Sequence, residues 1–135
     1  MGNKTYLITG ASKGIGRSIA MRLAKDGIQV VLLARQSKEL EDACRDVQSL
    51  SSSSFMIACD LAQSDSIDTA IESFNGIDSI DGIVHNAGTI APIQPMFEAE
   101  TDAWERNIQV NITGVQRLTK GLYAKMKASD RCRGT

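Results

Sequence analysis

The chain has 135 residues, 42% of them hydrophobic and 23% charged, which fits one globular domain and excludes an intrinsically disordered chain. Fifteen basic and sixteen acidic residues leave a net charge of -1, so no broad positive field attracts nucleic acid or an anionic membrane. We therefore expect neither a nucleic-acid nor a membrane partner, and any anion-binding site must be local.

The first part of the chain alternates between strand and helix patterns. Residues 5–9 are β-branched and apolar and are followed by a glycine, which is typical of a buried strand. Apolar residues at helical spacing predict a helix over 15–23, and Gly27 is placed to end it. The continuous apolar run at 28–34 predicts a second buried strand.

The same alternation continues through the middle of the chain. Apolar residues between 40 and 47 predict a helix, with Ser37 as its N-terminal cap. A short polar tract separates this helix from a third strand, which we expect at 55–59.

A third helix and a fourth strand follow. The helix is expected over 67–74, capped by Ser64 or Asp65, and the strand over 81–85. From about Thr101 onward the pattern predicts one long helix. Its expected apolar face consists of Trp104, Ile108, Ile112, Val115, Leu118, Leu122 and Met126.

Parallel strands need crossover connections, and the alternating helices supply them. The sequence therefore predicts an α/β fold, a doubly wound parallel sheet with right-handed crossovers that is truncated after about four strands. We expect residues 1–135 to form a single, partial domain. Its uncovered sheet edge and helix faces would favour self-association.

A glycine-rich turn at residues 9–16 joins the first strand to the first helix. Gly10 permits a tight turn, Gly14 leaves room for a pyrophosphate near the backbone, and Gly16 lets the helix approach the sheet. The free N–H groups and the positive dipole at the helix start favour an anion. Because the spacing is G-x-x-x-G-x-G rather than G-x-G-x-x-G, an ordinary strand–helix turn stays an alternative to nucleotide binding.

The turn and three later motifs together resemble the classical short-chain dehydrogenase/reductase family. The turn is similar to the cofactor loop of the family, and residues 60–61, Asp-Leu, match the element whose Asp hydrogen-bonds the adenine amino group. Residues 86–88, Asn-Ala-Gly, match the element beside the adenosine ribose, and Asn111 matches the active-site asparagine. The resemblance implies a Rossmann-type, NAD(P)-binding domain over residues 1–135.

The turn after the second strand indicates which cofactor is preferred. An acidic residue at this point binds the ribose hydroxyls of NAD, whereas a basic residue accommodates the 2′-phosphate of NADP. No carboxylate occupies the turn here, and the guanidinium of Arg35 can donate two hydrogen bonds to a phosphate. Lys13 offers a second cation and Ser12 a hydroxyl, so we expect NADP (NADPH), although each cation alone could be an ordinary surface residue.

The cofactor-binding residues expected from the motifs and from this argument are Thr9, Gly10, Ser12, Lys13, Gly14, Ile15, Gly16, Arg35, Asp60, Leu61, Asn86, Ala87 and Gly88.

The resemblance implies an oxidoreductase that transfers hydride between NADP and a small-molecule carbonyl or alcohol. Its members use a Ser, a Tyr, a Lys four positions after the Tyr, and a supporting Asn, and only Asn111 maps. Tyr123 and Lys127 fit the Tyr-x-x-x-Lys spacing, but they lie on the same expected helix as Asn111. We interpret them as a surface pair. The catalytic Ser and Tyr–Lys are therefore expected to be absent, and this chain alone is not expected to catalyse the reaction.

Two further features sit near the expected site. His85 stands where the family often has another Asn, and with no partner mapped beside it we interpret it as a strand-end histidine rather than a base. Residues 88–100 contain both prolines and predict a surface loop, which somewhat resembles the sepiapterin and benzil reductase branch.

The cysteines indicate a reducing compartment. Cys44, Cys59 and Cys132 form no CxxC pair, which argues against a disulfide framework and against a metal site. No basic segment followed by a long apolar run opens the chain, so we expect no signal peptide. We therefore expect a cytoplasmic protein.

Three functional hypotheses stay open from the sequence. The first is a fragment of an NADP-dependent reductase whose catalytic residues would follow Thr135. The second is a catalytically dead nucleotide-binding or interaction protein that self-associates, and the third is an unstable product without function. The substrate, the reaction direction and the oligomeric state do not follow from these residues.

Overall fold

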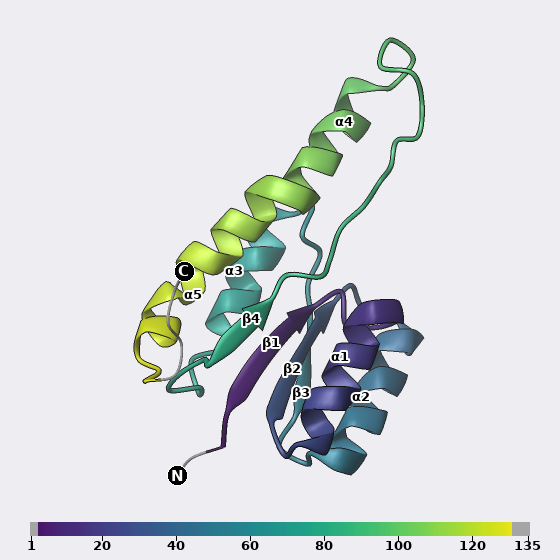
Figure 1. The fold of residues 1–135 in the computed structure, drawn as a ribbon. Coiled ribbons are helices and arrows are strands. Elements are labelled where there is room, and N and C mark those ends of the chain that lie inside the picture. The colour runs from purple at the N-terminus through teal and green to yellow at the C-terminus, as the bar shows by residue number, and fades with distance from the viewer. Residues whose placement is uncertain (1–2, 131–135) are drawn as a thin grey trace.

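Four apolar segments form one parallel sheet in the computed structural model, which describes residues 3–130 (Figure 1). The strands are β1 (Thr5–Thr9), β2 (Gln29–Ala34), β3 (Phe55–Ala58) and β4 (Gly82–Val84). They pair in the order β3-β2-β1-β4, with Leu7 opposite both Val31 and Ile83. The predicted alternation of strands and helices is confirmed.

Helices cover both faces of the sheet. α1 (Gly14–Lys25) and α2 (Lys38–Leu50) lie on one face, and α3 (Ser64–Glu72) and α5 (Gly114–Lys127) lie on the other (Figure 1). α4 (Thr101–Ile108) and a π-helical turn, η1 (Gln109–Thr113), lead directly into α5. The arrangement is the Rossmann-type, doubly wound α/β fold that the sequence predicts.

Alternating side chains of the strands build two separate cores. Val31 and Leu33 of β2 pack toward α3 and α5, whereas Val30 and Leu32 pack toward α1 and α2. All four side chains are fully buried. Burying one such side chain contributes about 1.5–3 kcal/mol, so this continuous apolar run fits only a strand that is covered on both faces.

The helix starts agree with the sequence in one case and differ in another. Ser37 caps α2 as predicted, its Oγ accepting the N–H of Leu40 at 3.1 Å. The predicted cap of α3 at Ser64 or Asp65 is wrong, because the helix begins at Ser64 and its N-cap residue is Gln63, without a side-chain bond. Here Ser66, inside the first turn, instead accepts the N–H of Asp60 at 2.8 Å and ties the preceding turn to the helix.

The predicted apolar face of the long helix is only partly correct. Leu118 and Leu122 are fully buried, but Trp104, Ile108 and Ile112 are exposed. α4 extends past the carboxyl edge of the sheet, where no other layer covers it (Figure 1). The π-helical turn also adds a residue to the helical repeat and rotates the apolar pattern of α4 relative to that of α5.

Residues 85–100 form the loop between β4 and α4, which includes the surface loop expected at 88–100. The peptide bond between Ala91 and Pro92 is cis. The side chains of Ile90, Ile93, Met96 and Phe97 are exposed along it.

The described part of the chain bears on three features, namely membrane-spanning helices, metal sites and the state of the cysteines. Between residues 3 and 130, no helix has the length and apolar character needed to cross a membrane. No cluster of three His, Cys, Asp or Glu side chains that could hold a metal occurs in the same range. Cys44 and Cys59 are buried free thiols, and burial raises the pKa of each. Cys132 and the chain end at 133–135 lie outside the described residues.

Candidate functional site

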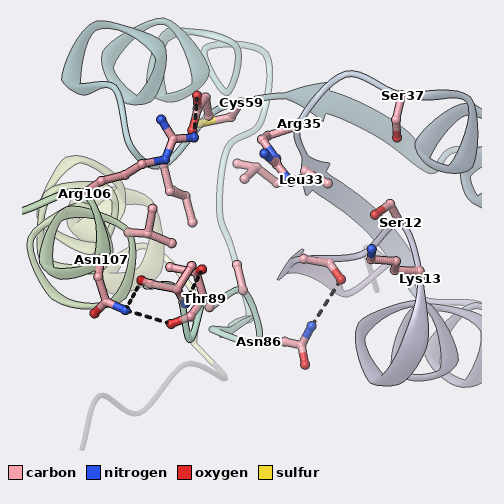
Figure 2. A pocket seen from close by; sticks show the side chains of 18 of the residues that line it. Ser12, Lys13, Leu33, Arg35, Ser37, Cys59, Asn86, Thr89, Arg106 and Asn107 are labelled. Atoms are coloured by element: carbon pink, nitrogen blue, oxygen red, sulfur yellow. Dashed lines mark hydrogen bonds and ion pairs between the residues drawn. The ribbon is translucent and has the colours of Figure 1, made fainter. Parts of the chain in front are cut away.

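The carboxyl ends of the strands open onto a cleft with a volume of about 680 Å³ (Figure 2). This volume lies within the range of about 300–1,000 Å³ that small-molecule sites occupy. Open α/β sheets bind their ligands at this edge. The predicted residues that line the cleft are Gly10, Ser12, Lys13, Arg35, Asp60, Leu61, Asn86, Ala87 and Gly88.

The glycine-rich turn has the backbone geometry that its sequence requires. Gly10 and Gly14 have φ angles of 63° and 59°, which side chains other than glycine rarely adopt. A Cβ on Gly10 would lie 2.9 Å from Ala87 Cα, whereas one on Gly14 would meet nothing within 4 Å. Gly10 therefore allows the segment after β4 to approach, and Gly14 leaves open space at the start of α1. Gly16 is buried, and a Cβ there would collide with the carbonyl oxygen of Gly10.

The start of α1 has an electrostatic bias toward anions. No acidic residue lies in its first turn, and no side chain caps it. The first N–H groups of a helix have no partner within the helix, so they are available to a ligand. Gly14 and Ile15 border a shallow depression beside the cleft rather than the cleft itself.

Thr9 and Asn86 hold the floor of the cleft together. Thr9 is almost fully buried, and its Oγ1 accepts the N–H groups of Asn86 and Ala87 at 3.1 and 3.0 Å. The Asn86 side chain donates to the carbonyl oxygens of Thr9 and Gly10 at 3.2 and 3.1 Å. These bonds fix the turn after β1 against the turn after β4, so both motifs act as one rigid unit.

Two cations line the cleft without a charged partner. Lys13 and Arg35 are exposed, and neither forms an ion pair within residues 3–130. They lie on the same side of the cleft as Ser12 and Ser37, opposite Arg106 and Asn107 (Figure 2). A dianionic group entering between them would gain charge-assisted hydrogen bonds.

Glu39, Arg106 and Asn107 are among the polar residues of the cleft that the sequence reasoning missed. Glu39 lies in the first turn of α2, where its charge also suits the helix dipole. Arg106 and Asn107 come from α4, and only the tertiary position of this helix brings them to the cleft. Asn107 lies one helical turn before the predicted Asn111, but nothing in the sequence indicated that this helix reaches the cleft.

Asn107 and Asn111 clamp the loop after β4. Asn111 accepts the N–H of Thr89 at 2.8 Å and donates to its carbonyl oxygen at 2.7 Å. Asn107 donates to the carbonyl oxygens of Thr89 and Ala91 at 3.2 and 2.8 Å, and accepts from Asn111 at 3.1 Å. Asn111 lies in the π-helical turn and outside the cleft wall, so in this state its amide serves the loop backbone.

His85 faces α5 rather than the cleft wall. Its Nε2 lies 2.9 Å from Thr119 Oγ1, and that hydroxyl donates to the carbonyl oxygen of Val115 at 2.7 Å. With the Thr119 proton directed to Val115, the contact is satisfied by the tautomer that carries its proton on Nε2. His85 is exposed as a residue, but partial desolvation of its ring lowers the pKa.

Tyr123 and Lys127 lie at the other end of the molecule. Both are exposed on the last turns of α5. The carbonyl oxygen of Lys125, between them, accepts the N–H of Ile80, just before the amino end of β4. The cleft lies beyond the carboxyl ends of the strands, so this pair does not face it.

The fold and the glycine-rich turn define a Rossmann-type α/β protein. A family model described as short chain dehydrogenase matches residues 4–135. The chain therefore belongs to the short-chain dehydrogenase family.

Its relatives are about twice as long. An uncharacterized oxidoreductase of Listeria monocytogenes is 35% identical over 117 residues, which cover 84% of this chain and 46% of the relative. L-sorbose reductase of Gluconobacter frateurii, solved with NADPH and L-sorbose, is 32% identical with a TM-score of 0.85, covering 95% of this chain and 49% of that one. A short-chain dehydrogenase of Escherichia coli CFT073, solved with NADPH, is 29% identical with a TM-score of 0.85, covering 96% and 56%. This chain thus spans about half the length of the relatives it matches.

Proposed function

We propose that this chain binds NADP and forms the cofactor-binding part of an oxidoreductase that acts on a carbonyl or alcohol. The observation that carries the proposal is the pair of cations, Lys13 and Arg35, on one cleft without a charged partner among residues 3–130. No carboxylate occupies the turn after β2. The NADPH in two structural relatives also supports the proposal.

The residues of the cleft fit the parts of this cofactor. Arg35 and Lys13, with Ser12, would bind the 2′-phosphate, and the open backbone at Gly14 would bind the pyrophosphate at the start of α1. Asp60, with Leu61, would bind the adenine at the far wall of the same cleft. Thr9 would contribute by holding the floor of the cleft rigid.

The reaction of the whole protein is part of the same proposal. When bound, NADPH supplies the hydride, and the remainder of the site must orient the carbonyl and supply a proton. Asn111 is the supporting catalytic residue that we assign here, and the catalytic Ser and Tyr–Lys are not assigned to any described residue. We expect no NADPH-dependent carbonyl reduction by the 135-residue chain alone, and turnover by purified material would contradict this expectation.

Calorimetric titration with NADPH and with NADH tests the cofactor preference. We expect NADPH to bind at least about tenfold more tightly, because hydrogen bonds to charged groups are the strong ones. Arg35→Asp should reverse the preference, since a carboxylate repels the 2′-phosphate and accepts the ribose hydroxyls of NADH. Arg45→Asp is the matched control, because Arg45 lies on α2 with an exposed partner, Asp42, and outside the cleft. Equal binding of both cofactors by the unsubstituted chain would refute the proposal.

A second candidate is a catalytically inactive binding protein that associates with itself. The observation that favours it is the exposed apolar side of α4 and η1, formed by Trp104, Ile108 and Ile112. This candidate also uses the cleft, so the two candidates differ in turnover and not in cofactor binding.

We also propose that the protein works in the cytoplasm. Cys44 and Cys59 are free thiols, as they would be in a reducing compartment.

A further inference from the structure

Arg106 of α4 and Asp60 of the turn after β3 meet at one wall of the cleft. Both side chains line it, and Arg106 Nη2 lies 3.9 Å from Asp60 Oδ2. The side chains are 52% and 33% exposed, so both are open to a ligand in the cleft. Among residues 3–130, no other ion pair joins two walls of this cleft.

The backbone at Asp60 is already fixed by other contacts. Its N–H donates to Ser66 Oγ at 2.8 Å, which ties the turn to α3. Its carboxylate has two contacts, the N–H of Ala62 on Oδ1 at 3.0 Å and Arg106 beside Oδ2. A carboxylate has about four lone-pair sites, so these contacts set its orientation and leave positions for a donor in the cleft.

We propose that Arg106 is a positioning residue that holds the Asp60 carboxylate toward the base of the bound dinucleotide and thereby favours adenine. This inference rests on the proposed function, because it requires a dinucleotide in the cleft. The exocyclic amino group of adenine donates hydrogen bonds to a carboxylate. A base with a carbonyl oxygen at that position, such as hypoxanthine, presents an acceptor, which the carboxylate repels.

The ion pair is well suited to this role and poorly suited to stabilising the fold. An exposed pair with a long separation adds little to the free energy of unfolding, because water screens the charges. Its loss therefore leaves the fold in place and frees the torsions of the Asp60 side chain. The consequence is a loss of selectivity for the base rather than a uniform loss of binding.

The test compares NADPH with reduced nicotinamide hypoxanthine dinucleotide phosphate by calorimetric titration of the 135-residue chain. For Arg106→Met we expect the preference for NADPH over the hypoxanthine cofactor to fall about fivefold. This is less than the full contribution of a hydrogen bond to a carboxylate, because the Asp60 side chain is still present. Arg106→Lys should give an intermediate preference, because it keeps the charge but not the planar fork. In an Asp60→Ala background, Arg106→Met should change the preference no further.

Arg117→Met is the matched control. Arg117 of α5 also loses an ion pair, its contacts with Asp68 at 2.8 and 2.6 Å, but it lies outside the cleft. We expect this variant to keep the full preference for NADPH. An equal weakening of both cofactors by Arg106→Met, or an unchanged preference in Arg106→Met and Arg106→Lys, would overturn the positioning role while leaving the proposed function intact. If the unsubstituted chain binds neither cofactor, the proposed function fails as well.

Discussion

His85 is the single histidine of the sequence, so its titration can be followed without assignment among several rings. Burial lowers its pKa below the ordinary value of 6.5, which the unfolded chain keeps. Between the folded-state pKa and pH 6.5, the unfolded state binds more protons than the folded state. The free energy of unfolding therefore rises with pH in this range. We expect the contribution of His85 to be complete above 6.5 and to be lost as the pH falls through the folded-state pKa. Urea unfolding at a series of pH values, together with the NMR shift of the ring protons, measures both quantities.

His85→Gln should remove this part of the pH dependence. Gln can still donate a hydrogen bond to Thr119 but does not titrate, so the comparison separates the ionisation from the contact. A ring that titrates above 6.5 in the folded chain would show that a neighbouring acceptor outweighs burial.

At the scale of elements, α5 approaches the turn after β3 at Gly114. A Cβ at this position would lie 2.7 Å from the carbonyl oxygen of Gln109 and 2.8 Å from that of Leu61. Gly→Ala within a helix ordinarily stabilises a protein by about 0.5–1 kcal/mol. For Gly114→Ala we instead expect a loss of about 1–3 kcal/mol, because both opposing atoms are backbone and the helix must shift. The midpoint of urea unfolding measures the change.

Gly121→Ala provides the comparison on the same helix. Its Cβ would meet the end of the Ile71 side chain, which can rotate away, so the cost should be smaller. Equal or greater stability of Gly114→Ala than of the unsubstituted chain would mean that α5 is free to move away from the turn.

The elements differ in how far the sequence predicts them. The four strands follow from short apolar runs, and the start of α2 follows from Ser37, because these signals are local. The π-helical turn has no such signal. It forms where Asn111 bonds to Thr89 and Gly114 meets Leu61, and these contacts join segments far apart in the chain. Helical periodicity alone therefore predicted one regular helix from Thr101 onward.

At the scale of the whole molecule, the features set by local sequence were again predictable, and those set by tertiary contacts were not. The two cores were predictable, since a continuous apolar run such as β2 must be covered on both faces. The resemblance assigned the glycine turn and the motifs at 60–61 and 86–88 to one cofactor. Both motifs and residues 10, 12 and 13 of the turn line one cleft. The wall formed by Arg106 and Asn107 was not predicted, because it depends on where α4 lies relative to β3. Binding of a cofactor by these residues stays a prediction.

The exposed side of α4 and η1 should govern the association of the whole molecule. Trp104, Ile108 and Ile112 are 46%, 38% and 64% exposed, and such neighbouring apolar side chains favour contact with another apolar surface. We expect association that rises with protein concentration, measured by sedimentation velocity. The double substitution Ile108→Glu with Ile112→Lys should reduce it, because association would then bury two charges.

Leu50→Glu is the control for this measurement, since Leu50 is also an exposed apolar residue, at the end of α2 on the opposite face of the sheet. If it reduces association as much as the double substitution, the contact is nonspecific rather than located on α4. A chain that stays monomeric at its highest soluble concentration would show that three exposed side chains do not offset the entropy lost on association. Because both substituted positions lie outside the cleft wall, NADPH binding should be unchanged, which separates self-association from the proposed cofactor site.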